Sequence, residues 1–191
     1  VSELKDVEVV ASDAYEGRKT GTKGAEMART YLTSRLKEIG LKPYPGKNSY
    51  EQDFEVKGRN GAEAIKGKNL IAYIPGKSDD VIVISAHYDH IGIIKNEVYN
   101  GADDNASGVA GLLHFAKYFS KNKPNNTLIF AIFDAEEMSL QGAKAFVANP
   151  PVALEKIKLN INMDMISHND KGELYAVGTF KYTELKRFFN T

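Results

Sequence analysis

The first part of the chain repeats its hydrophobic positions with a helical period. Between Thr22 and Ile39, apolar residues recur every three or four positions, and Gly40 stands where a helix commonly ends in a left-handed residue. This spacing predicts a helix over residues 22–39, and a shorter helix can form over residues 3–11. After them, residues 50–56 alternate like a half-buried strand, and with residues 69–74 they predict an antiparallel pair.

Three apolar runs beyond residue 80 are typical of buried strands: 81–85, 127–133 and 159–165. Helical spacing fills the intervals over residues 107–119 and 139–147. Buried strands that alternate with helices predict parallel strands joined by right-handed crossovers. A strand at 174–177 and a helix at 183–189 complete the expected order. The predicted fold class is α/β, a three-layer sandwich whose mixed, mostly parallel central sheet has helices on both faces.

Composition narrows the class of protein. A chain of 191 residues fits one domain, residues 1–191, which can bury about 70% of its unfolded surface. Because 25 basic residues balance 25 acidic ones, we expect no nucleic-acid partner and no attraction to an anionic membrane. No apolar run has the length of a transmembrane segment. The lack of cysteine excludes disulfides, thiol nucleophiles and cysteine-type zinc sites.

Histidine and acidic residues gather at the ends of the apolar runs. The candidates are His87 and Asp89 after the first run, Asp104 in the loop before a helix, Glu136 and Glu137 after the second run, and Asp164 in the third. Polar groups at strand ends of an alternating strand–helix chain converge on one edge of a sheet. One imidazole with several carboxylates predicts an oxygen-rich site for a divalent metal that is one ligand short.

Each motif also has a purely structural interpretation. His87 and Asp89 can be a hydrogen-bonded strand end and a turn former, and the acids at 136–137 can interact with a helix dipole. Asp164 is harder to explain in this way, because a carboxylate within an apolar strand needs a partner or a metal. All the motifs at one edge of one sheet favour the metal site over the separate structural roles.

The loop that contains Asp104 has two further interpretations. Its Asp and Asn residues can form turns ahead of a helix cap at Ser107. The match to a calcium-binding EF-hand loop fails at the twelfth position, which requires Glu and is His114 here. We interpret His114 as a partly exposed helical residue and His90 as a loop residue beside the site.

Five segments of the chain resemble a known enzyme family: GRKTGTKGAEMARTYLTSRLKEIGLKP, SAHYDHIG, NGADDNASG, FDAEEMSLQGA and NINMDMI. In these motifs the chain is similar to the co-catalytic di-zinc aminopeptidases, which include secreted bacterial leucyl-type enzymes and have glutamate carboxypeptidase II and glutaminyl cyclase as relatives. The resemblance covers nearly the whole chain. It implies a zinc-exopeptidase-like form of the sandwich.

The resemblance also implies roles for the candidate residues. As zinc ligands it implies His87 and Asp164 for one ion, Glu137 for the second ion, and Asp104 as the bridge between the two. Glu136 would be the general base acting on a metal-bridging water, and Asp89 would orient His87. The peptide bond between Asp104 and Asn105 would be cis.

The chain departs from the family at its C-terminal end. In the family, the last histidine ligand of the second metal comes from a loop beyond the position of Thr191, so we expect a domain truncated at its C-terminus. His168 follows Asp164 by four residues and is a conceivable substitute, although four strand residues span about 13 Å. Of the two zinc ions in a complete enzyme, we therefore expect one well-formed site here.

The implied function is a metal-dependent aminopeptidase that acts on peptides with a free N-terminus. Two alternatives stay open. One is an impaired fragment or a non-catalytic binding module on the same fold, and the other is a glutaminyl-cyclase-like acyltransferase. A secreted or periplasmic location is expected from the resemblance and from the start at Val1, which lacks an initiator Met. Side-chain specificity and oligomeric state are not predicted.

Overall fold

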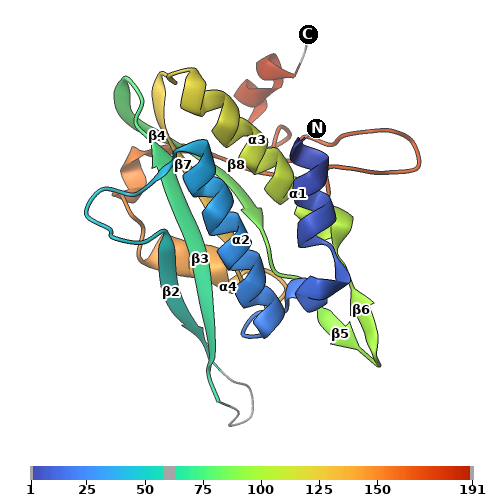
Figure 1. Cartoon of the computed structure of the whole chain (residues 1–191). Coiled ribbons are helices and arrows are strands. Elements are labelled where there is room, and N and C mark those ends of the chain that lie inside the picture. The colour runs from blue at the N-terminus through green and yellow to red at the C-terminus, as the bar shows by residue number, and fades with distance from the viewer. Residues whose placement is uncertain (1, 58–62, 190–191) are drawn as a thin grey trace.

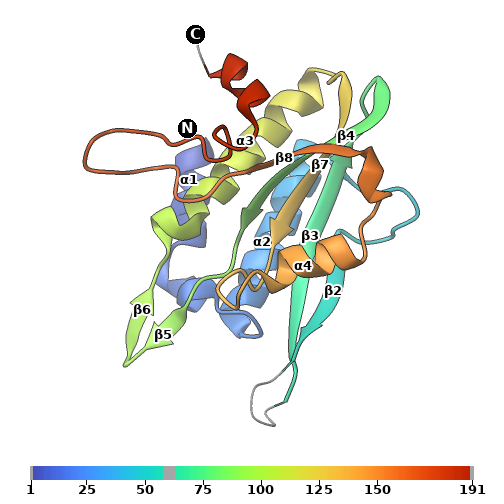
Figure 2. The same ribbon diagram turned by 180° about the vertical axis from the view of Figure 1, so that it is seen from behind.

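The chain folds into three layers around a central sheet. The computed structural model describes residues 2–57 and 63–189. Helices α1 (Ser2–Val10), α2 (Lys23–Ile39) and α3 (Gly108–Lys121) cover one face of the sheet, and α4 (Gln141–Ala148) covers the other (Figures 1 and 2). The predicted α/β sandwich is confirmed.

Helix α2 has the ends that its sequence predicts. The Thr22 side chain accepts a hydrogen bond from the backbone N–H of Ala25, which satisfies a donor of the first turn. At the other end Gly40 has a φ of 90°, and its N–H donates to the backbone oxygen of Lys37. The apolar stripe between these caps is buried against the sheet.

The sheet contains β1 (Lys42–Pro43), β2 (Glu51–Val56), β3 (Ile65–Ile74), β4 (Ser78–His87), β7 (Asn126–Phe133) and β8 (Ile157–Asn162). The strand order is β1-β3-β7-β4-β8, and β2 also pairs with β3. Strand β4 is parallel to both β7 and β8, whereas β3 is antiparallel to β1, β2 and β7. The mixed sheet and the antiparallel β2–β3 pair are thus confirmed. Among the described strands, parallel pairing is confined to the β7–β4–β8 half.

The remaining elements are short. Strands β5 (Gly92–Ile94) and β6 (Glu97–Tyr99) form a separate hairpin that the sequence pattern did not predict. The described residues also form the short helical segments η1 (Asp13–Arg18), η2 (Ala102–Ser107), η3 (Leu154–Lys156) and η4 (Thr183–Phe188). Segment η2 leads directly into α3, so it ties the loop before that helix to the helix itself.

The core lies on both faces of the sheet because the central strands are apolar on both sides. In β7, Leu128, Phe130 and Ile132 pack under α1, α2 and α3. The alternate residues Ile129, Ala131 and Phe133 pack with Phe146 of α4 on the opposite face. A strand buried on both faces reads as a continuous apolar run, which is why residues 127–133 could be predicted from sequence.

Three expectations for the last part of the chain are wrong. Strand β8 ends at Asn162, so Asp164 follows the strand instead of lying within it. Leu174–Val177 is not a strand, and the side chains of Leu174 and Val177 are 76% and 96% exposed. Residues 183–188 form a short 3₁₀ segment instead of an α-helix, because an isolated short helix without tertiary packing is marginal.

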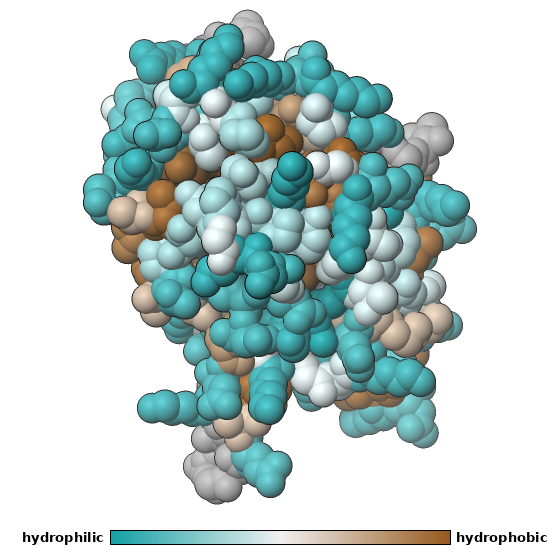
Figure 3. Space-filling view, turned by 60° about the vertical axis from the view of Figure 1, so that its left-hand side comes forward, coloured by the Kyte–Doolittle hydropathy of each residue, from teal (hydrophilic) through white to brown (hydrophobic). Residues whose placement is uncertain are grey.

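The surface is largely hydrophilic on the side shown in Figure 3, where hydrophobic residues occupy small separate areas. Within the described ranges, no helix combines the length and the apolar character needed to cross a bilayer.

Candidate metal centre

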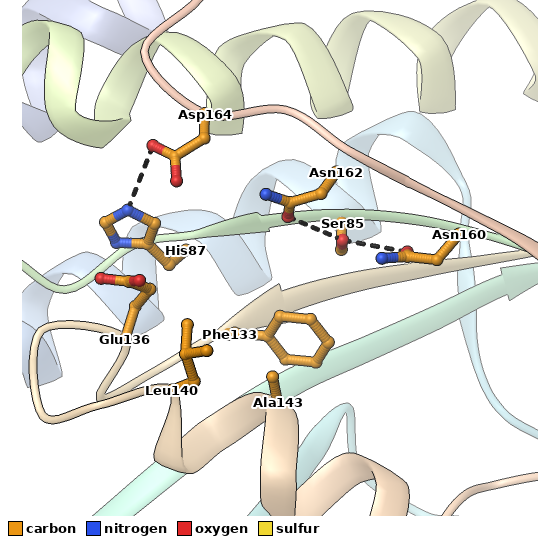
Figure 4. Close-up of a pocket in the computed structure, with 9 residues that line it drawn as sticks. All are labelled: Ser85, His87, Phe133, Glu136, Leu140, Ala143, Asn160, Asn162 and Asp164. Carbon is orange, nitrogen blue, oxygen red and sulfur yellow. Dashed lines mark hydrogen bonds and ion pairs between the residues drawn. The ribbon is translucent and has the colours of Figure 1, made fainter. Parts of the chain in front are cut away.

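The predicted site residues meet at the carboxyl end of the parallel strands. His87 is the last residue of β4, Glu136 and Glu137 lie in the turn after β7, and Asp164 lies two residues beyond β8. Asp104 comes from η2. Because β4 runs parallel to β7 and β8, all three strands open toward one edge of the sheet. Figure 4 shows His87, Glu136 and Asp164 around one pocket at this edge.

His87, Asp104 and Asp164 form a compact group of ligand atoms. The Nε2 atom of His87 lies 3.2 Å from Oδ1 of Asp104 and 3.5 Å from Oδ1 of Asp164. Tetrahedral zinc with bonds of about 2.0–2.2 Å holds its ligand atoms about 3.3–3.6 Å apart, so the spacing fits such an ion. The imidazole is buried, whereas the two carboxylates are partly exposed.

Asp89 lies behind this group and holds two parts of the site. The backbone oxygen of Asp89 is 3.1 Å from Nδ1 of His87, and since a carbonyl only accepts, Nδ1 carries a proton in this contact and Nε2 is the nitrogen that faces the two carboxylates. The Asp89 carboxylate is buried; its Oδ1 accepts from the N–H of Glu136 at 3.0 Å, and its Oδ2 accepts from the N–H of Glu137 at 3.2 Å. Asp89 thus positions both the histidine and the turn that carries the paired glutamates.

The charges of the site shift the pKa values of two groups. Burial acts to lower the pKa of His87, but neighbouring carboxylates, Asp89 first among them, outweigh burial and raise that pKa to about 9. Burial raises the pKa of Glu136 above its usual range, and the surrounding carboxylates raise it further. Glu136 is therefore a stronger base than an exposed glutamate.

A second group of ligand atoms forms around Glu137. Its Oε1 lies 2.8 Å from Nδ1 of His90, and the same nitrogen is 3.7 Å from Oδ2 of Asp104. Sequence reasoning placed His90 beside the site without a role. His168 and His114 are exposed, and neither belongs to the two groups found among the described residues.

Asn105 ties the Asp104 loop to the Asp164 loop. The peptide bond between Asp104 and Asn105 is cis, as the resemblance implies. The buried Asn105 amide donates to the backbone oxygen of Met163 at 2.9 Å, and its Oδ1 accepts from the N–H of Gly108 at 2.9 Å. The sequence placed this asparagine in a turn but contained no signal for its contact across the site.

Arg18 is a buried cation that joins the end of helix α1 to two loops of the site. Its guanidinium donates to four backbone oxygens, those of Val10, Tyr88, Asn100 and Gly101, at 2.6–2.9 Å. Tyr88 lies between His87 and Asp89, and Gly101 precedes the Asp104 segment. Arg18 therefore fixes the positions of two ligand-bearing loops relative to each other.

A pocket of about 170 Å³ opens beside the first group of ligand atoms (Figure 4). Phe133, Leu140 and Ala143 form its apolar wall. On the other side, Ser85 donates alternately to Asn160 at 3.0 Å and Asn162 at 2.9 Å. The cavity is smaller than the roughly 300–1,000 Å³ of sites for whole drug-sized ligands, and its size suits one side chain.

Comparison with known proteins identifies related sequences over most of the chain. The profile described as Peptidase family M28 matches residues 69–191. The chain is 38% identical over 98 residues to a vacuolar membrane protease of Schizosaccharomyces pombe; the aligned segment covers 50% of this chain and 11% of that protein. It is 32% identical over 125 residues to leucine aminopeptidase 1 of Sclerotinia sclerotiorum; this alignment covers 59% of this chain and 32% of that protein.

Solved structures share the fold. A glutaminyl cyclase of Porphyromonas gingivalis superposes with a TM-score of 0.71 at 25% identity, over 86% of this chain and 58% of that chain. A leucine aminopeptidase precursor of Bacteroides thetaiotaomicron gives 0.72 at 22% identity, over 88% of this chain and 63% of that chain. A Zn-dependent exopeptidase of Parabacteroides distasonis gives 0.71 at 21% identity, over 88% and 62%. The zinc-exopeptidase-like fold is confirmed.

The expectation of a secreted or periplasmic location is contradicted by the curated relatives. Several of them, all from fungi, are named vacuolar membrane proteases. The expectation relied on a resemblance and on the missing initiator Met, and neither feature reports the compartment in which a chain works.

Proposed function

The chain belongs to Peptidase family M28, and on this premise we propose that it is a metal-dependent aminopeptidase, which removes N-terminal residues from peptides. Membership of the family confirms the resemblance seen in the motifs. The observation that carries the proposal is the convergence of His87, Asp104 and Asp164 on one point beside Glu136. Because the chain spans less than two thirds of the relatives' length, the activity itself is a proposal.

The donor set fits zinc. One imidazole nitrogen and two carboxylate oxygens are ligands that zinc accepts, and their spacing agrees with tetrahedral coordination. We assign His87, Asp104 and Asp164 to the first ion and Glu137 to a second. When bound, the metal supplies Lewis acidity, which polarises the scissile carbonyl and makes a water molecule more acidic.

Glu136 is proposed as the general base. Its side chain lines the same pocket as His87 and Asp164 but belongs to neither group of ligand atoms, which leaves its carboxylate available for proton transfer. Its pKa is raised toward neutral pH, which makes the carboxylate a better base for taking a proton from water and returning it to the leaving amine. Asp89 positions Glu136 through the backbone N–H of that residue.

The proposed substrate is a peptide with a free amino terminus. The partly exposed carboxylates of Asp104, Asp164 and Glu137 place the proposed metal ligands at the mouth of the site, where the end of a peptide can reach them. The apolar wall of the pocket offers space for the side chain of the N-terminal residue.

Replacement of the base tests the proposal. Zinc-loaded protein is assayed with aminoacyl-nitroanilides, and Glu136→Gln is expected to lower kcat by about 10²–10⁴-fold while zinc binding persists. The matched control is Glu155→Gln, the same change at an exposed residue near the opposite end of β8, with activity as in the unchanged protein. Undiminished cleavage by Glu136→Gln would reject the proposal.

The glutaminyl cyclases among the similar structures favour a second candidate, intramolecular acyl transfer. The paired glutamates at 136 and 137 are compatible with both an aminopeptidase and a cyclase, so they do not distinguish the two functions. Peptides that begin with Gln distinguish the two: a cyclase produces a pyroglutamyl peptide and ammonia, whereas an aminopeptidase releases free glutamine. A chain that binds no divalent ion would instead favour a non-catalytic binding module.

A further inference from the structure

Thr20 is a buried residue of the loop between η1 and α2, and it contacts the groups that lie behind the proposed metal centre. Its hydroxyl donates to Oδ1 of Asp134 at 2.8 Å, and Oδ2 of Asp89 is a second acceptor at 3.5 Å. We propose that Thr20 is a positioning residue for Glu136, because it fixes the two carboxylates that hold the turn carrying Glu136. The inference rests on the proposed function for the role of Glu136 as general base.

The turn after β7 is held by these two carboxylates. Three consecutive backbone N–H groups, those of residues 135, 136 and 137, each donate to one of them. The first bonds to Oδ1 of Asp134 at 2.9 Å, and the next two bond to Oδ1 and Oδ2 of Asp89 at 3.0 and 3.2 Å. Hydrogen bonds to a charged acceptor are stronger than those to a neutral one. The backbone from which the Glu136 side chain projects is therefore set by where the two carboxylates lie.

Ala135 shows that this turn has to be held in place. It has a φ of 53°, in the left-handed region that a residue with a Cβ rarely adopts. Such a conformation is unfavourable for alanine and persists only where the surrounding contacts enforce it. The residue is buried, and its N–H is bonded to Asp134. A change in the position of that carboxylate therefore acts directly on the residue before Glu136.

A hydroxyl suits the place where the two carboxylates come near each other. Asp89 and Asp134 are 1% and 0% exposed, so bulk water does not screen their charges. Burial and the charge of Asp89 raise the pKa of Asp134, whereas hydrogen bonds from the Lys68 N–H and the Thr20 hydroxyl act in the opposite direction. A hydroxyl supplies a hydrogen without adding a charge, and its O–H can turn toward either acceptor. Without the hydroxyl, the contact that joins the two carboxylates is lost.

The loop that carries Thr20 is anchored next to Asp89. Arg18, two residues before Thr20, donates to the backbone oxygen of Tyr88 at 2.7 Å. The backbone oxygen of Arg18 in turn accepts from the N–H of His90 at 3.4 Å. The loop is thus bonded to the residues on both sides of Asp89. Because threonine is β-branched, its side chain has few rotamers, and the hydroxyl stays directed at the carboxylates.

Paired substitutions at Thr20 test the inference in the full, zinc-loaded chain. Thr20→Val removes the hydroxyl and keeps the shape, Thr20→Ala removes it without steric demand, and Thr20→Ser keeps it. With aminoacyl-nitroanilides, the valine and alanine variants are expected to lower kcat about tenfold with KM within about twofold, and the serine variant to lose less than about threefold. Thr30→Val is the matched control, because it makes the same change at an exposed threonine of α2, and its kcat is expected to equal that of the unchanged protein.

Backbone hydrogen exchange measured by NMR follows the turn without any need for activity. In Thr20→Val, exchange is expected to be at least about tenfold faster at residues 135–137 and to change less than about twofold at residues 129–132 of β7. A merely structural role of Thr20 would speed exchange equally in both segments. Equilibrium dialysis with Zn²⁺ checks that the variants load with metal, and far-UV circular dichroism checks that they are folded.

The results separate this inference from the proposed function. Unaltered exchange at residues 135–137 in folded Thr20→Val would overturn the inference, and so would equal acceleration across β7. If exchange in the turn depends on the hydroxyl but the unchanged chain releases no N-terminal residues, the hold of Thr20 on the turn stands and the aminopeptidase proposal fails. If Glu136→Gln abolishes cleavage while Thr20→Val cleaves like the unchanged protein, the function stands and the positioning role fails.

Discussion

Asp89→Asn removes a negative charge from the interior while it keeps the shape of the side chain. In the structure, the two carboxylate oxygens accept from the N–H groups of Glu136 and Glu137 at 3.0 and 3.2 Å, and Oδ1 lies 3.6 Å from Nδ1 of His87. An asparagine has one carbonyl oxygen and one NH₂ group. Whichever way it turns, one of the two backbone donors faces another donor.

The cost follows from that mismatch. A hydrogen bond to a charged acceptor contributes about 1.5–3 kcal/mol, and a buried donor without a partner adds about 1–3 kcal/mol. Since the Asp89 side chain is 1% exposed, water does not replace the lost acceptor. We expect Asp89→Asn to lower the free energy of unfolding by about 3 kcal/mol, which for a domain of this size shifts Tm by roughly 6–12 °C. We also expect zinc affinity to fall by about 10–100-fold, because the turn and the imidazole lose a partner.

Urea unfolding of the chelator-treated protein, followed by circular dichroism, measures the first effect, and zinc titration measures the second. Asp79→Asn is the control, since it makes the same chemical change at an exposed residue whose ion-pair partner, Lys156, is 3.7 Å away. Its free energy of unfolding is expected to change by no more than about 0.5 kcal/mol, as is usual for substitutions at the surface. If Asp89→Asn unfolds like Asp79→Asn and binds zinc like the unchanged chain, the turn does not depend on Asp89 and the reasoning is wrong.

Three further predictions concern stability. Arg18→Met leaves four backbone oxygens without their donor, and we expect the free energy of unfolding in urea to fall by about 3–5 kcal/mol and zinc to bind more weakly. A decrease below about 1 kcal/mol would contradict the role of Arg18 as a link between loops. His87 has a folded-state pKa of about 9, above its ordinary 6.5, so in the zinc-free protein its stabilising effect is complete below pH 6.5 and is lost as the pH rises through 9. Relative to His87→Gln, the free energy of unfolding should fall by about 3 kcal/mol between these pH values. Parallel pH profiles of the two proteins would refute this prediction. Phe146→Ala removes a buried ring that packs edge-on against Phe133 with ring centroids 5.6 Å apart, and we expect the free energy of unfolding to fall by about 3–5 kcal/mol. Thermal unfolding measures the effect, and a decrease in Tm of less than about 3 °C would show that packing on the α4 face contributes little to stability.

Much of the site could be predicted because its residues follow strands with a strong apolar pattern. His87 ends β4, and the acids at 136–137 follow β7; both strands are buried, and both were evident as apolar runs. Parallel strands open toward the same edge, so convergence followed from the order of the elements. Asp164 was assigned to the right edge, although the strand before it ends at Asn162, three residues earlier than predicted.

His90, Arg18 and Asn105 could not be given roles in the same way. Each acts through a contact between loops that are distant in sequence, such as Arg18 with Gly101 or Asn105 with Met163. Local patterns contain no information on which loops touch. The strand expected at residues 174–177 is wrong for a related reason: a short run with a suitable pattern becomes a strand only where it pairs with another strand, and these residues pair with none of the described strands.

The sequence by itself determined the class of fold, the buried strands and the residue types that can bind a divalent metal. These follow from periodicity and from chemistry, both of which are local properties of the chain. Tertiary structure decided the partners: β4 lies between β7 and β8, which brings His87 between Asp104 and Asp164 and leaves His90 facing Glu137. Distances of about 3 Å between side chains from separate loops depend on strand order and on loop conformation, and only the packed structure defines both.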